Sequence, residues 1–245
     1  MLRPFQIVRL VVSGSIFFLF LTAVTYPQAQ SPAAVTFTLD FPTSQPEHYS
    51  IRVPSDGSAH YQSSGRLSPD SDETDSRDLD SHDKDPQDKD SRHKDSFDLD
   101  FTLAAETRQK IFELAAKAGY FQKDVDSHHK GLAFTGKKTL SYKDGQRSGE
   151  SSYNYSPNSA VQELTDLMQN LSATLEFGHR LQYDHRFQKL ALDEELKRME
   201  EMARSNQLIE VAAIQLILDQ IIADQSVINV TRARAQRLLE RAGGH

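Results

Sequence analysis

The chain of 245 residues contains no cysteine. Disulfide bonds, thiolate metal sites, cysteine nucleophiles and a lipid-modified cysteine anchor are therefore excluded. The chain also lacks a basic excess, because 28 lysines and arginines are outnumbered by 35 aspartates and glutamates, giving a formal net charge of −7. Nucleic-acid binding depends on a basic surface, so we expect no nucleic-acid partner.

Hydrophobic residues are also few, at 38% of the chain. That fraction is low for a protein that packs along its whole length. The length leaves room for one full domain and an appendage. We therefore expect part of the chain to lie outside any packed core.

The N-terminal segment, residues 1–33, is typical of an export signal. Arg3 and Arg9 precede an uncharged, mostly apolar run over residues 10–24, which is short for a bilayer span. Ser31-Pro32-Ala33 offers a cleavage site. We expect an extracytoplasmic protein, periplasmic or secreted. The alternative is an uncleaved N-terminal anchor, and only then do we expect contact with a membrane.

Residues 97–121 carry the clearest local pattern. Hydrophobic and acidic residues alternate over 97–101, which predicts a strand with one face in a core. Thr102 is predicted to cap a helix that begins there, with Ile111 and Leu114 on its apolar face. Gly119 is predicted to end that helix, because a left-handed cap favours a residue without a Cβ.

Several further strands follow from alternation and turn chemistry. Residues 35–41 predict one strand, and two hairpins are predicted around Asp56-Gly57 and Asp144-Gly145. Ser156-Pro157-Asn158 opens a second helix with apolar positions continuing to Leu171. The fold class we predict is α+β over residues 35–171, an antiparallel sheet of Asp-Gly hairpins packed on two helices and followed by an all-helical C-terminal segment.

Six consecutive pentads, each ending in aspartate, occupy residues 71–100. These thirty residues carry twelve acidic and five basic side chains. Such a segment cannot offset its ordering entropy by burial, so we interpret residues 71–95 as a disordered insert in the α+β domain. An alternative is low-affinity calcium binding by the aspartates, although the spacing matches no EF-hand loop.

Residues 172–245 predict only helices. One long helix is predicted over 171–206, a second over 207–223 that is apolar on nearly every face, and a third over 227–242 with Ile228 facing inward. An all-round apolar helix needs cover on several sides. We expect it to fold against the long helix or to form a dimer.

Two resemblances accompany these patterns. The run YSIRVPSDGSAHYQSSG, the helix ending in KAGYF and the segment YNYSPNSAVQELTDLMQNL resemble uncharacterised exported bacterial proteins with a small sheet-plus-helix domain. This resemblance implies an extracytoplasmic setting and supplies no catalytic or binding residue. The last two helices resemble a single HEAT repeat, from which the spacing at Val230-Thr231-Arg232 departs.

No motif in the sequence defines a catalytic, cofactor or metal site. Residues 131–137, GLAFTGK, match part of a phosphate-binding loop, but Lys138 replaces the required Ser or Thr and a hairpin follows. Two groups offer metal-ligand side chains without a ligand spacing. The first is Asp126, His128 and His129, and the second is His179, Tyr183 and His185. Exposed arginines on the last helix, Arg234, Arg237 and Arg241, could meet acidic partners or the pentads.

The hypothesis that these patterns favour is a non-enzymatic exported protein with an interaction surface in residues 172–245. The surface would serve a protein partner or self-association, because the apolar helix has no evident cover in the sequence. Calcium binding by the pentads is the alternative. A hydrolase with a dispersed site is a third hypothesis, and it requires a pocket with convergent titratable side chains.

Overall fold

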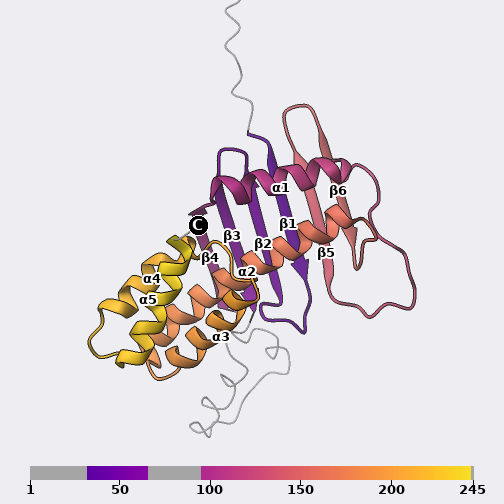
Figure 1. Ribbon diagram of the computed structural model, residues 1–245. Coiled ribbons are helices and arrows are strands. Elements are labelled where there is room, and N and C mark those ends of the chain that lie inside the picture. Colours follow the sequence, from indigo (N-terminus) through magenta and orange to yellow (C-terminus); the bar gives the residue numbers. More distant parts are fainter. Residues whose placement is uncertain (1–31, 66–94, 244–245) are drawn as a thin grey trace, which may run out of the picture. The chain divides into compact units, whose positions relative to one another are not determined.

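The structure, a computed structural model, describes residues 32–65 and 95–243. Six strands form one antiparallel sheet in the order β4-β3-β2-β1-β5-β6 (Figure 1). The strands are β1 (Ala34–Asp40), β2 (His48–Pro54), β3 (Ser58–Gly65), β4 (Asp95–Thr102), β5 (Lys137–Lys143) and β6 (Ser148–Tyr153). The predicted α+β class and its antiparallel sheet are confirmed.

Both predicted Asp-Gly turns connect adjacent strands, but by different means. Between β2 and β3, Gly57 adopts φ +94° and the Ser58 N–H donates to Asp56 Oδ1 at 2.9 Å. Between β5 and β6, Asp144 Oδ1 accepts the N–H groups of Gln146 at 2.7 Å and Arg147 at 2.6 Å. Those two backbone N–H groups lower the pKa of Asp144 to about 2.

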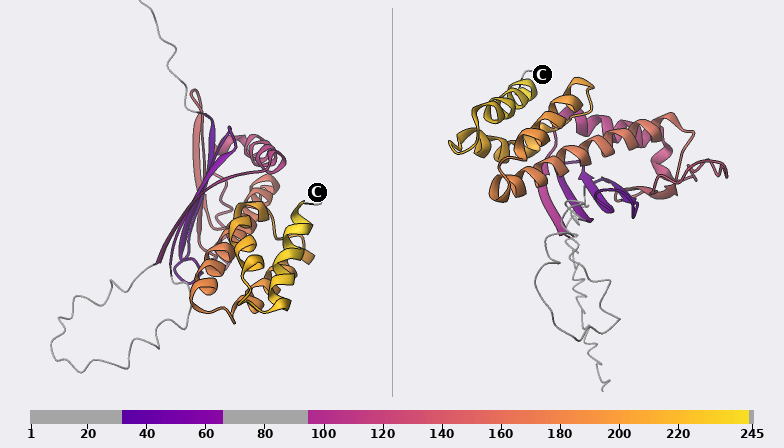
Figure 2. Two further views of the ribbon diagram at one scale, coloured as in Figure 1. Left: turned by 90° about the vertical axis from the view of Figure 1, so that its left-hand side faces the viewer. Right: turned by 90° about the horizontal axis from the view of Figure 1, so that it is seen from below.

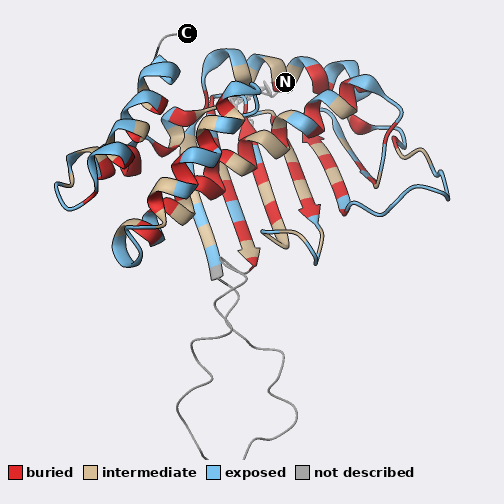
Figure 3. Cartoon of the chain, turned by 60° about the horizontal axis from the view of Figure 1, so that its bottom comes forward, coloured by how far each residue is buried: buried red, intermediate tan, exposed pale blue. Residues whose placement is uncertain are grey.

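The register places the large apolar side chains of all six strands on one face. Phe37 of β1 lies opposite Ile51 of β2 and Leu140 of β5, and Ile51 lies opposite Tyr61 of β3. All four are fully buried. Buried and more accessible residues alternate along the strands, as a sheet with one covered face requires (Figure 3).

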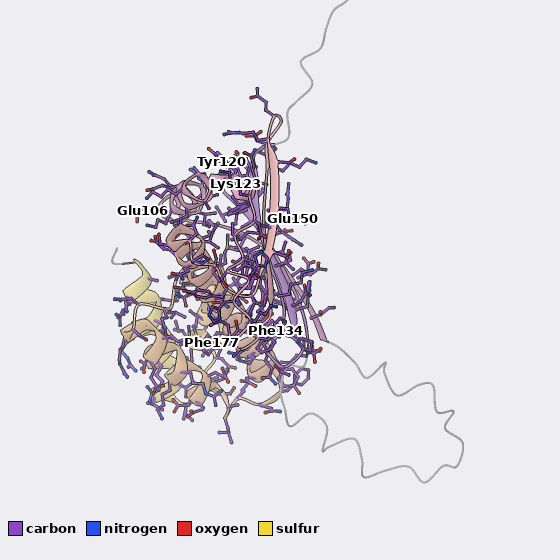
Figure 4. All side chains as sticks on the ribbon, turned by 90° about the vertical axis from the view of Figure 1, so that its right-hand side faces the viewer. Glu106, Tyr120, Lys123, Phe134, Glu150 and Phe177 are labelled. Carbon is purple, nitrogen blue, oxygen red and sulfur yellow. The ribbon has the colours of Figure 1, made fainter. Side chains whose placement is uncertain are left out.

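Two helices cover this apolar face. Helices α1 (Ala105–Lys117) and α2 (Ser159–Phe187) both lie on the same side of the sheet (Figure 2). Asn158 caps α2, and its side chain accepts from the N–H of Ala160 at 2.9 Å. Figure 4 places Glu106 of α1 on the helical side and Glu150 of β6 on the opposite face of the sheet.

The predicted cap of α1 is wrong. Thr102 is the last residue of β4, and the N-cap position belongs to Ala104. The Ala104 N–H donates instead to Glu210 Oε2 at 3.1 Å, so a side chain more than a hundred residues away satisfies the helix end. Continued pairing of Thr102 with Ser58 in the sheet explains the difference.

A left-handed turn ends α1, as predicted from Gly119. Gly119, Tyr120 and Phe121 have φ of +66°, +55° and +59°, and together form the short element η2. This turn packs against Gly149 of β6, where an added Cβ would lie 2.2 Å from the Tyr120 carbonyl oxygen. A side chain at position 149 is therefore incompatible with the observed backbone approach.

The predicted long helix over 171–206 is wrong. Helix α2 continues to Phe187, Gln188 leaves the helical conformation with φ −140° and ψ 56°, and a new helix α3 (Leu192–Arg204) follows. The break lets the stripe on α3 turn back and bury itself against neighbouring helices. The buried stripe consists of Leu192, Leu196, Met199 and Ala203.

The predicted helix over 207–223 is also shorter than expected. Residues 207–210 are not helical, and the chain then forms η3 (Val211–Ile214) and α4 (Gln215–Ala223). Helix α5 (Asn229–Gly243) ends the described chain, and Ile228 is 53% exposed rather than inward. Neighbouring helices bury the inner stripe of α4, so cover within the chain replaces the external cover we considered.

One hydrophobic core joins the sheet to the C-terminal helices. It extends from Val35 in β1 to Leu238 in α5. The domain boundary predicted after Leu171 falls inside α2, which continues without a break through that position. The predicted signal, residues 1–33, and the predicted insert, residues 71–95, lie outside the described residues except at their C-terminal ends.

Candidate functional site

A buried carboxylate links α2 to the sheet. Glu176 of α2 is 7% exposed, and its Oε1 accepts from the Tyr61 hydroxyl at 2.7 Å and from the Ser63 hydroxyl at 2.6 Å. Ser172, one turn earlier in α2, lies 3.0 Å from the Tyr61 hydroxyl oxygen. Both strand residues come from β3, so one carboxylate fixes α2 against that strand.

The second oxygen of Glu176 faces a histidine. His179 Nδ1 lies 3.8 Å from Oε2, within ion-pair distance. The His179 ring stacks on Phe97 of β4 with centroids 4.2 Å apart. Glu176 therefore has one oxygen bound by two hydroxyl groups of β3 and the other beside the His179 ring.

The electrostatics of this cluster favour an ionised Glu176. Burial by itself raises the pKa of this carboxyl, but the His179 ring and the hydroxyls of Ser63 and Tyr61 outweigh burial and lower the pKa. Burial and the charge of Glu176 raise the pKa of Tyr61, so its hydroxyl stays protonated and donates. The cluster holds a buried negative charge at neutral pH.

A groove of about 330 Å³ opens beside this carboxylate. The β1–β2 loop forms one wall and α2 forms the other, with Met202 of α3 at the margin. Leu39, Pro46, Tyr49 and Phe177 supply apolar surface. Sequence reasoning missed this site, although Glu176 interrupts the sheet-facing stripe of α2, and an acidic residue on such a stripe was a usable signal.

The predicted cluster of Asp126, His128 and His129 does not converge. His128 Nε2 lies 2.7 Å from Asp124 Oδ2, while Asp126 accepts the N–H of Asn154 at 3.0 Å. His129 Nδ1 accepts from the Gly131 N–H at 3.3 Å. These groups shape the loop after η2. A side-chain hydrogen bond and the charge of Asp124 raise the pKa of His128.

His179, Tyr183 and His185 likewise contact different partners. His179 belongs to the Glu176 cluster, whereas His185 Nε2 lies 3.0 Å from Asp224 Oδ2 in the α4–α5 turn. Tyr183 packs on the Phe187 ring with centroids 5.1 Å apart. Among residues 32–65 and 95–243, no three His, Asp or Glu side chains group as a metal site.

The GLAFTGK segment has no helix after it. It leads into β5, as the sequence indicated, and Lys138 is a buried residue of that strand. The Lys138 ammonium donates to the Asn154 carbonyl at 3.0 Å and the Thr135 hydroxyl at 3.0 Å. Burial lowers the pKa of Lys138. This lysine fastens the loop that precedes β5 to the end of β6.

The arginines of α5 find partners on α3. Arg234 Nε donates to Asp193 Oδ1 at 2.9 Å, and Arg237 Nη2 donates to Glu200 Oε1 at 2.7 Å. These two side chains form ion pairs between two helices, while the expected pairing with the pentads concerns residues outside the described ones and stays a prediction. Arg237 and Arg241 also line a groove of about 410 Å³ between α3 and α5.

Several exposed apolar side chains lie near two turns of the helical region. The described residues include nine large apolar side chains that are exposed, and five of them lie near the α2–α3 and α4–α5 turns. Contacts join those turns: Lys189 Nζ donates to Asp224 Oδ2 at 2.5 Å, and Thr231 donates to Asp193 at 3.2 Å. We call these five residues the apolar end: Tyr183, Phe187, Leu190, Ile228 and Val230.

No helix within the described parts of the chain has the length and hydropathy needed to cross a membrane. Comparisons with protein-family models, with curated protein sequences and with solved structures gave no match for this chain. The candidate sites therefore rest on geometry alone. There are two of them in the described residues, the groove at Glu176 and the apolar end.

Proposed function

We propose that the protein is a non-enzymatic exported protein that associates with a second copy of itself through the apolar end. The observation that carries this proposal is that five of the nine exposed large apolar side chains of the described residues lie near two turns that Lys189 and Asp224 join. Apolar surface collected in one place favours association, whereas the same residues scattered singly would need no explanation.

Hydrogen bonds hold together the two turns that carry the apolar end. Asp224 accepts from Lys189 and from Ser226, and these hydrogen bonds lower the pKa of its carboxyl. Asp224 is therefore ionised at neutral pH and bridges the two turns. Phe187 at 61% exposure and Leu190 at 87% project from this fixed base. A fixed apolar surface loses little conformational entropy on binding.

Charges of both signs lie near the apolar end. The Arg186 guanidinium lies over the Phe187 ring at 5.0 Å. Glu194, near the start of α3, has a side chain that is 59% exposed and lies 3.9 Å from Lys197 and 3.7 Å from Arg198. A two-fold arrangement makes each patch face itself, so unlike charges of the two copies can meet at its margin.

Light scattering coupled to size-exclusion chromatography tests the proposal on the mature chain. Five side chains per copy form a small interface, so we expect a concentration-dependent dimer with a roughly micromolar or weaker Kd. Leu190→Ser combined with Phe187→Ser should abolish the dimer. The free energy of unfolding should change by less than about 0.5 kcal/mol, because both side chains are exposed in the monomer.

Leu216→Ser is the matched control. Leu216 is 71% exposed at the start of α4, at the other end of that helix from the α4–α5 turn. Its replacement should leave dimerisation unchanged. A chain that is monomeric at all concentrations, or a dimer that is equally sensitive to the Leu216 change, contradicts the proposal.

A further inference from the structure

The loop between η2 and β5 supports an activity separate from self-association. We propose that residues 130–137, which we call the lysine-flanked loop, dock on an anionic lipid membrane, with Leu132 and Phe134 inserted among the headgroups. Figure 1 shows the segment between η2 and β5 projecting beyond the sheet on the side of β5 and β6. Three observations support the assignment: exposed apolar side chains, a fixed backbone, and positive charge on both sides.

The apolar side chains of the lysine-flanked loop face solvent. Leu132 is 44% exposed and Phe134 is 59% exposed, and Ala133 between them is exposed as well. The Phe134 ring meets the Phe41 ring edge-on, with centroids 5.9 Å apart, so the fold supports one part of the ring and leaves the rest open. Two large side chains are too few to bury the roughly 800 Å² per partner of a standard protein interface. A lipid surface needs no matching shape and takes up a small apolar projection.

Hydrogen bonds fix the backbone that carries these side chains. The Asn154 side chain, directly after β6, donates to the Ala133 carbonyl at 2.9 Å and accepts from the Thr135 N–H at 2.9 Å. These two bonds satisfy backbone groups on either side of Phe134, as an apolar environment requires. Gly136 has φ +95°, and an added Cβ there would lie 2.8 Å from a side-chain atom of Leu39 in β1. The loop is therefore closely packed at its base and loses little conformational entropy on docking.

The charge next to the apolar side chains selects the partner. Residues 128–138 contain three lysines, two histidines and no acidic residue, in a chain whose formal net charge is −7. Lys130 and Lys137, on either side of the apolar run, are both exposed. Asp40 lies opposite Lys137 in the sheet, but its carboxylate already contacts His48 Nδ1 at 2.5 Å. Exposed lysines beside an apolar projection are attracted to the phosphates of anionic lipids.

A tryptophan reporter tests the insertion directly, because the chain contains no tryptophan of its own. Phe134→Trp should shift its fluorescence to shorter wavelength with vesicles of phosphatidylcholine and phosphatidylglycerol in equal parts, and show no shift with phosphatidylcholine alone. Leu216→Trp is the matched control, since Leu216 is also exposed, and its emission should not change. The chain from Ser31 onward is used, because every described core residue lies between Val35 and Leu238 and the apolar run 10–24 would itself bind lipid.

Two substitutions separate apolar insertion from charge in sedimentation with the anionic vesicles. Phe134→Ser should weaken binding roughly fivefold, and Leu132→Ser should give a similar loss if the first variant does not fold. Lys130→Glu should weaken binding roughly fivefold at low salt and much less at high salt, where the attraction is screened. Leu216→Ser should leave binding unchanged.

Three results would overturn the proposal. The first is equal binding to neutral and anionic vesicles. The second is unchanged vesicle binding by a folded Phe134→Ser or Leu132→Ser chain. The third is a Phe134→Ser chain that has lost self-association in light scattering, because the loop would then face a second copy instead of lipid.

Discussion

The two halves of α2 are held in different ways. The half before Phe177 lies on the sheet and is fixed by hydrogen bonds from Tyr61 and Ser63 to Glu176. The half after it packs against other helices, where Arg180 pairs with Glu195 of α3, and it keeps one contact with the sheet through His179 on Phe97 of β4. Apolar packing is common to both halves, since one core contains Leu164 and Leu181 alike.

This difference shows how each neighbour constrains the helix. A strand presents side chains at fixed register, so a buried polar group on α2 can meet the same hydroxyls reliably. Helices pack as ridges into grooves and tolerate small shifts in position. We therefore expect substitutions in the sheet layer to cost more than comparable substitutions in the helical region, and the following measurements test that expectation in order of decreasing effect.

Gly149→Ala in β6 should have the largest effect. The new Cβ would lie 2.2 Å from the Tyr120 carbonyl oxygen and 2.9 Å from the Gln122 nitrogen, so it meets backbone that cannot rotate away. We expect the free energy of unfolding to fall by about 3 kcal/mol in urea denaturation. Gly119→Ala is the control, because its Cβ meets nothing within 4 Å and only its φ of +66° is unfavourable. Equal losses in the two variants would contradict the steric argument.

Asp184→Asn should stabilise the helical region at pH 7.5. Burial and the charge of Glu195 raise the pKa of Asp184 to about 6 from 3.8. Between these two pH values the folded state binds more protons than the unfolded state, so native stability falls as pH rises through that range. We expect the variant to gain on the order of 1–3 kcal/mol at pH 7.5, with little change at pH 4.5, by thermal denaturation.

Asp144→Asn, in the sheet layer, should change the stability in the opposite direction from Asp184→Asn. Backbone hydrogen bonds lower the pKa of Asp144 to about 2, so its contribution to stability is present above the unfolded pKa and is lost as pH falls through the folded one. This variant should therefore lose stability at pH 7.5. A loss for Asp184→Asn at that pH would show that its buried charge is compensated.

Gly178→Ala, at the junction of the two halves, should have a smaller effect than Gly149→Ala. An added Cβ would lie 2.4 Å from Ile214 Cγ2, which is a side-chain atom of η3. We expect a loss of about 1–2 kcal/mol by urea denaturation, because overpacking exceeds the gain in helix propensity. Ile214→Leu moves that methyl group away from Cβ and should recover part of the loss in the double variant. The absence of such coupling would contradict the contact.

Local chemistry in the sequence was sufficient to predict the sheet. Alternation located β1 and β4, Asp56-Gly57 located a tight turn with φ of +94° at the glycine, and Asn158 located the cap of α2. These features depend on neighbours a few residues apart. The helical region was predicted less well, because the helical period continues through Gln188 although the chain turns there.

Local sequence patterns did not reveal the candidate sites. Glu176 looked like one acidic residue on a long helix, and its role depends on Tyr61 and Ser63, more than a hundred residues earlier. Ile228 of the apolar end was predicted to face inward and is 53% exposed, and Leu190, which follows the end of α2 at Phe187, is 87% exposed. The two histidine groups noted in the sequence lacked a ligand spacing, and their members contact different partners in the fold.

The amino-acid sequence by itself determined the strands, the turns, the first two helices and the absence of cysteine chemistry, since short-range sterics and periodicity fix each of them. Tertiary structure alone decided where α2 ends, which apolar residues face solvent, that Glu210 caps α1 and that Glu176 lies beside a groove. Those outcomes depend on which distant surfaces pack together, and burial is a property of the assembled core rather than of any local segment.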